Sequence, residues 1–206
     1  AGALPLEEMQ SFEDARRGFI ATDAPLKVTG PDGETVWDFE AYAFVDGDTP
    51  DTVNPSLWRQ AKLNGYHGLF EVVPGIHQVR GYDVSNMSLI EGRSGWIVVD
   101  PLTTRETAAA AIALARRHLG DRPVSAVIFT HSHVDHFGGI EGVLPPGPVT
   151  VPIVAPEGFM EQAIAGKVLT RPWIGVFYEP VTPALASRLA LPLDYGVLVR
   201  QSPGST

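Results

Sequence analysis

Four potential metal ligands lie close together in the sequence THSHVDH, which covers residues 130–136. Imidazole nitrogens bind zinc and other borderline divalent metals, and a carboxylate adds a harder oxygen ligand. His131 and His133 are two residues apart and can point to the same side of an extended loop. Asp135 and His136 then turn toward a second position. The spacing predicts a metal site, and the alternative is a polar loop with solvated histidines.

The residues just before these ligands read as a buried strand. The segment PVSAVIFT at 123–130 is too short and too rich in β-branched residues to be a helix. Polar groups that follow the carboxyl end of a strand in an α/β fold lie where a crevice is expected. Gly138 and Gly139 then permit a tight backbone at the start of a helix or turn.

A strand–helix–strand unit is predicted to carry the ligands. Thr103 and Glu106 predict a capping box, and Gly120 predicts the end of the helix. One apolar face runs along it, comprising Ala108, Ile112, Ala115 and Leu119. Short β-like runs precede it at 68–73, 77–81, 87–91 and 96–99. This order predicts a parallel pairing of 96–99 with 123–130 through a right-handed crossover.

The N-terminal third reads as an arm rather than as part of the body. Residues 6–20 predict a short, partly amphipathic helix, and 21–68 are rich in Pro, Gly and Asp. Aromatic side chains are scattered through this stretch at Trp37, Phe39, Tyr42, Phe44 and Trp58. Loops carry so many aromatic residues when they dock on a larger structure, so we expect an ordered arm over residues 1–66.

Composition excludes several classes of protein. The 206 residues carry a net charge of −9 and are 44% hydrophobic, which indicates one globular domain, or one and a piece of another. The acidic balance argues against a nucleic-acid partner. No apolar run reaches the roughly 20 residues needed to span a bilayer. The chain has no Cys, so disulfides and thiolate metal sites are excluded.

The charge is unevenly distributed along the chain. Residues 1–166 contain 22 acidic and 11 basic side chains, whereas residues 167–206 contain 2 acidic and 4 basic ones. The shift hints that the C-terminal segment has a different origin.

The ligand motif, placed after an apolar strand, resembles the signature of the metallo-β-lactamase superfamily. Five further segments are similar to the SDS-hydrolase type of alkyl sulfatase: PDTVNPSLWRQ at 50–60, GLFEV at 68–72, QVRGYDVSNM at 78–87, GWIVVDPLT at 95–103 and APEGFM at 155–160. The resemblance runs from about residue 10 to 163, and it is more specific than the metal motif alone.

This resemblance implies an α/β fold of the αββα sandwich type, of which we expect only the first half over residues 67–163. It implies hydrolysis of alkyl sulfate esters by a metal-activated water, with zinc as the cofactor and two ions in the complete site. His131 and His133 would hold the first metal, and Asp135 and His136 the second, with Asp135 also assigned to catalysis. Family likeness favours a periplasmic or secreted location.

The ligand set is incomplete when it is compared with that family. A complete dinuclear site needs further carboxylates and another His, yet no His follows His136. The acids that remain downstream are Glu141, Glu157, Glu161, Glu179 and Asp194. We expect packing or surface roles for the other three histidines, His67, His77 and His118.

The C-terminal segment, residues 164–206, resembles the opening of a PDZ domain of the high-temperature-requirement serine protease family. The similar stretches are GKVLTRPWIGV at 166–176, VTPALASRLALP at 181–192 and DYGVLV at 194–199. The resemblance implies that a loop binds a peptide carboxylate on its backbone N–H groups. That loop would consist of Trp173, Ile174, Gly175 and Val176. The alternative is a Pro-rich extension of the preceding body.

Two functions therefore compete. The first is a metal-dependent sulfuric ester hydrolase acting on an alkyl sulfate. The second is a non-catalytic chain, in which a metal-binding half-domain is joined to a partial peptide-binding module. A half-sandwich leaves one face of its sheet uncovered, so we expect self-association into homo-oligomers.

Overall fold

The computed structural model describes the backbone of residues 6–168, 177–180 and 197–200, and the side chains of residues 6–164. The chain divides into two compact units. The first comprises residues 1–130 and 135–155, and the second comprises residues 131–134 and 156–206. Each unit is described by itself.

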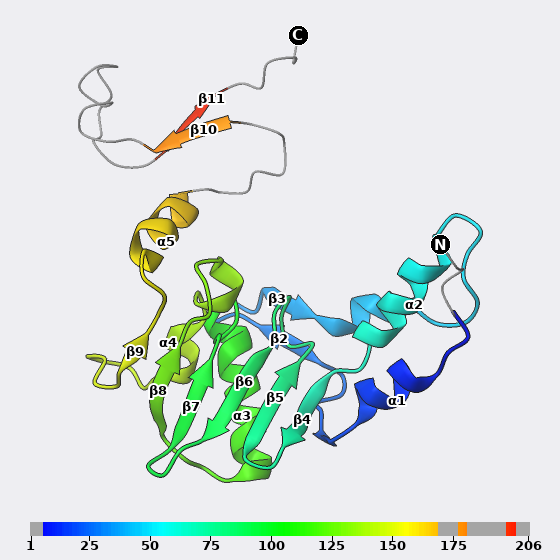
Figure 1. Cartoon of the computed structure of the whole chain (residues 1–206), viewed down its shortest axis with the longest axis horizontal. Helices are drawn as coiled ribbons and strands as arrows, with labels where there is room; N and C mark the ends of the chain where they lie inside the picture. The colour runs from blue at the N-terminus through cyan, green and yellow to red at the C-terminus, as the bar shows by residue number, and fades with distance from the viewer. Residues whose placement is uncertain (1–5, 169–176, 181–196, 201–206) are drawn as a thin grey trace. The chain divides into compact units, whose positions relative to one another are not determined.

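A seven-stranded sheet organises the first unit (Figure 1). Its strands, in spatial order, are β1 (Phe19–Ala21), β4 (Gly68–Val73), β5 (Ile76–Arg80), β6 (Met87–Glu91), β7 (Trp96–Val99), β8 (Val124–Ile128) and β9 (Ile153–Val154). Neighbours from β1 to β7 pair antiparallel, whereas β7–β8 and β8–β9 pair parallel. The predicted parallel pair is therefore confirmed, and the α/β fold with it.

The helices of the described residues are short except for one. They are α1 (Gln10–Arg16), the 3-10 turn η1 (Phe39–Tyr42), α2 (Pro55–Asn64), α3 (Arg105–Leu119), the 3-10 turn η2 (Val134–His136), α4 (Ile140–Val143) and α5 (Phe159–Val168). A separate hairpin joins β2 (Lys27–Thr29) to β3 (Thr35–Asp38). In the second unit, β10 (Phe177–Pro180) pairs antiparallel with β11 (Val197–Arg200).

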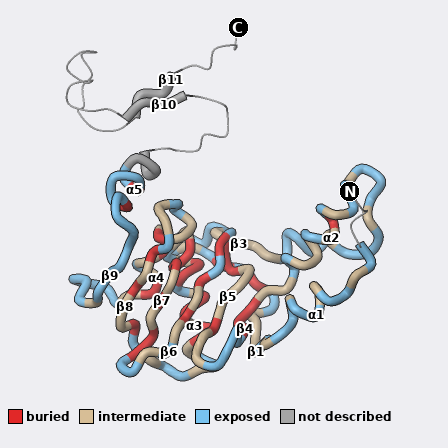
Figure 2. Tube along the Cα trace, in the orientation of Figure 1, coloured by how far each residue is buried: buried red, intermediate tan, exposed pale blue. Residues whose placement is uncertain are grey.

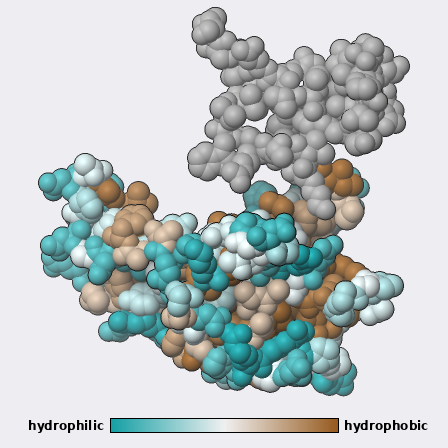
Figure 3. All heavy atoms as spheres, turned by 180° about the vertical axis from the view of Figure 1, so that it is seen from behind, coloured by the Kyte–Doolittle hydropathy of each residue, from teal (hydrophilic) through white to brown (hydrophobic). Residues whose placement is uncertain are grey.

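The core lies between the sheet and α3. Cross-strand pairing aligns His77, Leu89, Val98 and Val127 on one face, and all four are buried. Helix α3 crosses behind the strands and buries the apolar face on which Ala108, Ile112 and Ala115 lie. Figure 2 shows the buried residues concentrated along the central strands, while α1 and α2 are largely exposed. Figure 3 shows the opposite side, where hydrophilic residues cover much of the surface.

The predicted capping box of α3 is wrong by one residue. Thr104 is the N-cap: its Oγ1 accepts a hydrogen bond from Thr107 N at 3.1 Å, and Thr107 Oγ1 accepts from Thr104 N at 3.4 Å. Thr103 cannot cap because Asp83, from the β5–β6 loop, accepts hydrogen bonds from both its N and its Oγ1. A tertiary contact therefore sets the start of the helix.

The arm contains more regular structure than its composition predicts. The helix expected over 6–20 is only Gln10–Arg16, because Phe19–Ala21 joins the sheet as β1 beside β4. Helix α2 is not predicted, although Asn54 caps it and Pro55 occupies its first turn. The sequence does not predict this helix because Asn and Pro, which begin it, are also common in turns.

Asp23 links the arm (residues 1–66) to the rest of the first unit through hydrogen bonds and an ion pair. Its backbone N donates to Tyr82 Oη at 3.1 Å, and Tyr82 Oη donates to Asp23 Oδ2 at 2.9 Å. Its other carboxylate oxygen lies 2.6 Å from Arg117 Nη2 on α3. Burial, with the Asp23 carboxylate as a further cause, raises the pKa of Tyr82 to about 12.

No helix in the described part of the chain is both long and apolar enough to cross a membrane.

The raised pKa of Tyr82 predicts a specific alkaline instability. An unfolded tyrosine loses its proton near pH 10, whereas Tyr82 keeps it in the folded state to about pH 12. The free energy of unfolding therefore falls as pH rises across this window, by about 2 kcal/mol from this group. Urea titrations at pH 9 to 12 should show a shallower decline in Tyr82→Phe than in wild type. Tyr42→Phe, at an exposed site, should follow wild type.

The second face of the sheet is only half-buried. Its apolar side chains are aligned by the strand register and comprise Ile76, Ile90, Ile97, Val99 and Ile128. At the edge, Val154 of β9 pairs with Ile128, continues this face and is exposed. A contiguous apolar face of this kind favours association between molecules.

We expect the isolated chain to be larger than a monomer in solution, by light scattering. Ile97→Lys, in the middle of this face, should lower the apparent mass, because a charge there must lose its hydration on association. Ala109→Lys adds the same charge on the exposed side of α3 and should leave the mass unchanged. A monodisperse wild-type monomer would contradict the prediction.

Candidate metal centre

The ends of two parallel strands are joined by one carboxylate, Asp100. It follows β7 directly, and its side chain accepts hydrogen bonds from Thr130 N at 2.8 Å and Thr130 Oγ1 at 2.6 Å, just beyond β8. The backbone N of Asp100 donates to Ile128 O at 3.0 Å. Asp100 is 7% exposed, whereas Thr130 is exposed. This network fixes the point at which the ligand loop leaves the sheet.

The same carboxylate orients a predicted ligand. His136 Nδ1 lies 2.8 Å from Asp100 Oδ2. In a neutral imidazole, an Nδ1–H donated to the Asp100 carboxylate leaves the lone pair on Nε2, the atom that can bind a metal. Sequence analysis did not single out Asp100. The sequence does contain a signal for it: Asp100 is an acidic residue directly after an apolar strand, at the sheet edge where the ligands are expected.

The second predicted ligand of this pair faces the first. His136 Nε2 and Asp135 Oδ2 are 3.3 Å apart. Two ligands bound tetrahedrally to one zinc ion at about 2.1 Å are separated by roughly 3.4 Å. The two side chains are therefore close enough to pair with each other or to share one bound cation. The donor set of Asp135 and His136 therefore fits one divalent metal, with Asp100 as the orienting partner.

The other predicted pair belongs to the second unit. The rings of His131 and His133 are 4.6 Å apart between centroids and meet edge to face. Between them, Ser132 Oγ donates to Gln162 Oε1 of α5 at 2.8 Å. Because residues 131–134 and 135–155 fall in different units, each pair is placed only within its own unit. The described residues contain no cluster of three or more His, Asp or Glu side chains able to hold a metal ion.

Backbone strain accompanies the site. Asp100 and Leu102 have φ angles of 55° and 64°, in the left-handed region that non-glycine residues rarely adopt. Beyond the ligands, Gly139 N donates to Leu102 O at 2.8 Å. A Cβ atom at Gly139 would lie 2.2 Å from Pro101 O, so only glycine permits this approach. The predicted tight backbone at Gly139 is thus observed.

A rigid loop supports the Asp135 backbone. Ser85 Oγ donates a hydrogen bond to the backbone oxygen of Asp135. The neighbouring Asp83 is buried and is held by Thr103, by Thr107 Oγ1 at 2.6 Å and by Val84 N at 2.6 Å. The β5–β6 loop thereby links the start of α3 to the candidate centre.

The remaining histidines lie outside the arrangement of Asp100, Asp135 and His136, and His67 Nε2 and His77 Nδ1 are buried without a hydrogen-bond partner among the described residues. His77 is buried in β5 and meets the Trp96 ring edge to face, at 5.9 Å between centroids. His67 lies against Phe39, with 4.0 Å between ring centroids. His118 is exposed near the end of α3. The peptide-binding residues predicted at 173–176 lie outside the described residues.

The sequence profile of the Metallo-beta-lactamase superfamily matches residues 80–199, more than half of the chain. The chain belongs to this superfamily. The match covers the β5–β6 loop, Asp100 and all four predicted ligands. It also covers most of the segment whose likeness to a PDZ domain stays a prediction.

The relatives of this chain within the superfamily include sulfatases. The chain is 46% identical over 173 residues to an alkyl/aryl-sulfatase of Saccharomyces cerevisiae, covering 82% of this chain and 27% of that protein. It is 48% identical over 170 residues to an (R)-specific secondary-alkylsulfatase of a Pseudomonas species, covering 81% and 26%. The predicted resemblance to alkyl sulfatases is confirmed.

A solved structure agrees with the fold of this chain. The stereoselective inverting sec-alkylsulfatase of a Pseudomonas species superposes with a TM-score of 0.74 at 48% identity, covering 80% of this chain and 27% of that one. The chain thus spans about a quarter of the length of the curated relatives it matches. This is consistent with the expected first part of the superfamily fold.

Asp100→Ala should destabilise the first unit because it removes the acceptor of two bonds from Thr130 and one from His136. A hydrogen bond to a charged group contributes about 1.5–3 kcal/mol, and water can replace part of these bonds because Thr130 is exposed, so we expect a loss of about 2–4 kcal/mol in the free energy of unfolding. Urea unfolding in a chelator measures this without metal. Asp121→Ala, at a side chain that is 90% exposed, should change it by less than about 0.5 kcal/mol.

Proposed function

We propose that this chain is the metal-binding part of a metal-dependent alkyl sulfatase, which hydrolyses sulfate esters of alkyl alcohols. One observation carries the proposal: the Asp100–His136–Asp135 arrangement occurs in a chain that is 48% identical to alkylsulfatases. Conserving the fold alone does not require two donor atoms to face each other beyond the end of a strand.

The proposed cofactor is zinc, with two ions in the complete site. His131 and His133 would hold the first ion, and Asp135 and His136 the second. When bound, such metals lower the pKa of a coordinated water from 15.7 to about 7 and so supply hydroxide at neutral pH. Asp100 would keep the ring of His136 in the tautomer that binds metal through Nε2.

Charge gives a second reason for metals in this reaction. The chain has a net charge of −9, and an alkyl sulfate is an anion. The cationic centre would offset repulsion between the two. In the overall reaction, water breaks the ester linkage, giving an alcohol and inorganic sulfate, and the released proton goes to solvent.

A separate proposal concerns the C-terminal segment, which would bind the carboxylate of a peptide. The residues that would receive a peptide carboxylate are Trp173, Ile174, Gly175 and Val176. Its support is the ordered resemblance of three segments, and the antiparallel β10–β11 pair is compatible with a peptide-binding module that adds a strand. The alternative of a non-catalytic chain rests on this segment.

Metal content and sulfate release test the proposed activity. Wild type should bind two equivalents of zinc and release sulfate from decyl sulfate. Asp135→Asn removes a charged ligand, so it should lose one equivalent and reduce sulfate release by about 100-fold or more. The control His118→Gln removes an exposed imidazole and should retain both properties.

The outcomes separate the two functions. If metal-loaded wild type binds two ions and releases no sulfate, independent catalysis by this chain is contradicted. Binding of one ion or none would favour the non-catalytic alternative.

A further inference from the structure

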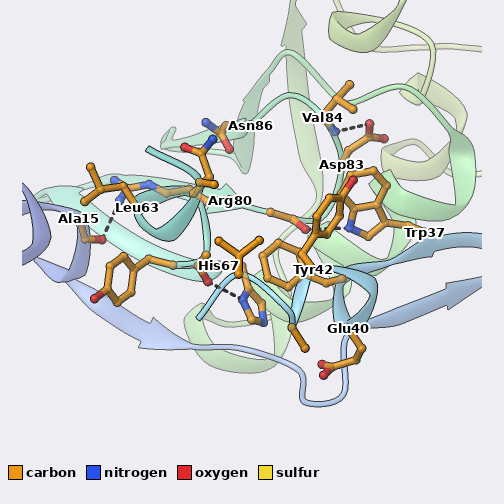
Figure 4. A pocket seen from close by; sticks show the side chains of 18 residues that line it. Ala15, Trp37, Glu40, Tyr42, Leu63, His67, Arg80, Asp83, Val84 and Asn86 are labelled. Atoms are coloured by element: carbon orange, nitrogen blue, oxygen red, sulfur yellow. Dashed lines mark hydrogen bonds between the residues drawn. The ribbon is translucent and has the colours of Figure 1, made fainter. Parts of the chain in front are cut away.

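The first unit contains a cavity of about 670 Å³ that the metal centre does not use (Figure 4). Its walls come from the arm, from helix α2, from the end of β5 and from the β5–β6 loop. The arm therefore encloses a space against the body instead of only covering it.

One wall of this cavity is aromatic and fixed. Trp37 Nε1 donates to Gly81 O at 2.9 Å, which holds the indole against the body. The Tyr42 ring lies 6.2 Å from that of Trp37 and 5.9 Å from that of Phe39, between centroids. Tyr42 is 50% exposed although its ring is large, so a substantial apolar area is available to a ligand.

The facing wall is the β5–β6 loop that supports the metal centre. Figure 4 shows Asp83, Val84 and Asn86 on this side of the cavity. Val84 is 72% exposed, an unusual position for a β-branched apolar side chain. The residue after it, Ser85, donates to the backbone of Asp135. The cavity therefore adjoins the proposed reaction site through one short loop.

The lining carries charged groups of both signs, the acids Glu40 and Asp83 and the base Arg80. Both carboxylate oxygens of Asp83 are already occupied by hydrogen bonds from Thr103, Thr107 and Val84. Arg80 is held as well, because its Nε donates to Gln78 Oε1 at 2.7 Å and its guanidinium carbon lies 4.3 Å from the centroid of the Phe70 ring. Asp83 and Arg80 are thus engaged within the protein, and the aromatic rings and Val84 supply the apolar part of the lining.

We propose that this cavity binds the hydrocarbon tail of the sulfate ester, with Tyr42 and Val84 as residues that determine tail length. The proposal rests on the proposed function, because the alkyl sulfate is the ligand that it places here. Burial of the tail between Tyr42 and Val84 removes apolar area from water on both partners. Affinity should therefore grow with each added methylene until the cavity is full.

Binding of alkyl sulfonates tests this without hydrolysis, since their carbon–sulfur bond resists the reaction. We expect calorimetric titration below micelle-forming concentrations, from butyl to decyl sulfonate, to show about a threefold to fourfold gain in affinity per methylene. Val84→Phe fills the cavity and should end this gain at a shorter chain. Tyr42→Ala should reduce the gain along the whole series.

Two matched variants serve as controls. Phe44→Ala removes an aromatic ring that is 71% exposed in the same segment and does not line the cavity. Val72→Phe makes the Val84 change on an exposed position of β4. Both should retain the wild-type dependence on chain length.

An unchanged dependence in Val84→Phe and Tyr42→Ala would overturn the inference, because the tail would then bind elsewhere, such as the half-buried face of the sheet. Equal losses in the controls would overturn it as well. Sulfate release is measured separately. Tail-dependent binding without hydrolysis would contradict the proposed function alone, while hydrolysis insensitive to both cavity variants would contradict this inference alone.

Discussion

The buried carboxylate of Asp100 is the constraint on which the site depends. A charged group removed from water must be fully hydrogen-bonded, and here the partners come from the end of β8 and from His136. Satisfying one carboxylate therefore joins two parallel strands and sets the orientation of an imidazole ring. The positive φ angles of Asp100 and Leu102 are the conformational cost of bringing these groups together.

Asp83 plays a comparable part on the other side of the site. Its oxygens fix the β5–β6 loop against Thr103 and Thr107 at the start of α3, and the same loop reaches the backbone of Asp135. Two buried acids thus create rigid supports from short segments.

The two faces of the sheet differ in burial. One face is closed by α3, while the aligned isoleucines of the other face remain half-buried. The chain spans about a quarter of the length of its curated relatives. The arm adds an aromatic cavity to this partial body, next to the loop that supports Asp135.

Local patterns in the sequence determined the strands 68–73, 87–91 and 96–99, the parallel pair around α3, and the four ligand candidates. Each of these features can be recognised within a few consecutive residues, from alternating apolar residues, from runs of β-branched residues or from closely spaced His and Asp side chains. Only the tertiary structure decided that Thr104 rather than Thr103 caps α3, that Phe19–Ala21 is a strand, and that Asp100 orients His136. Each of these depends on a hydrogen-bond partner distant in sequence: Asp83 for Thr103, β4 for β1, and His136 for Asp100. No local periodicity encodes such partners.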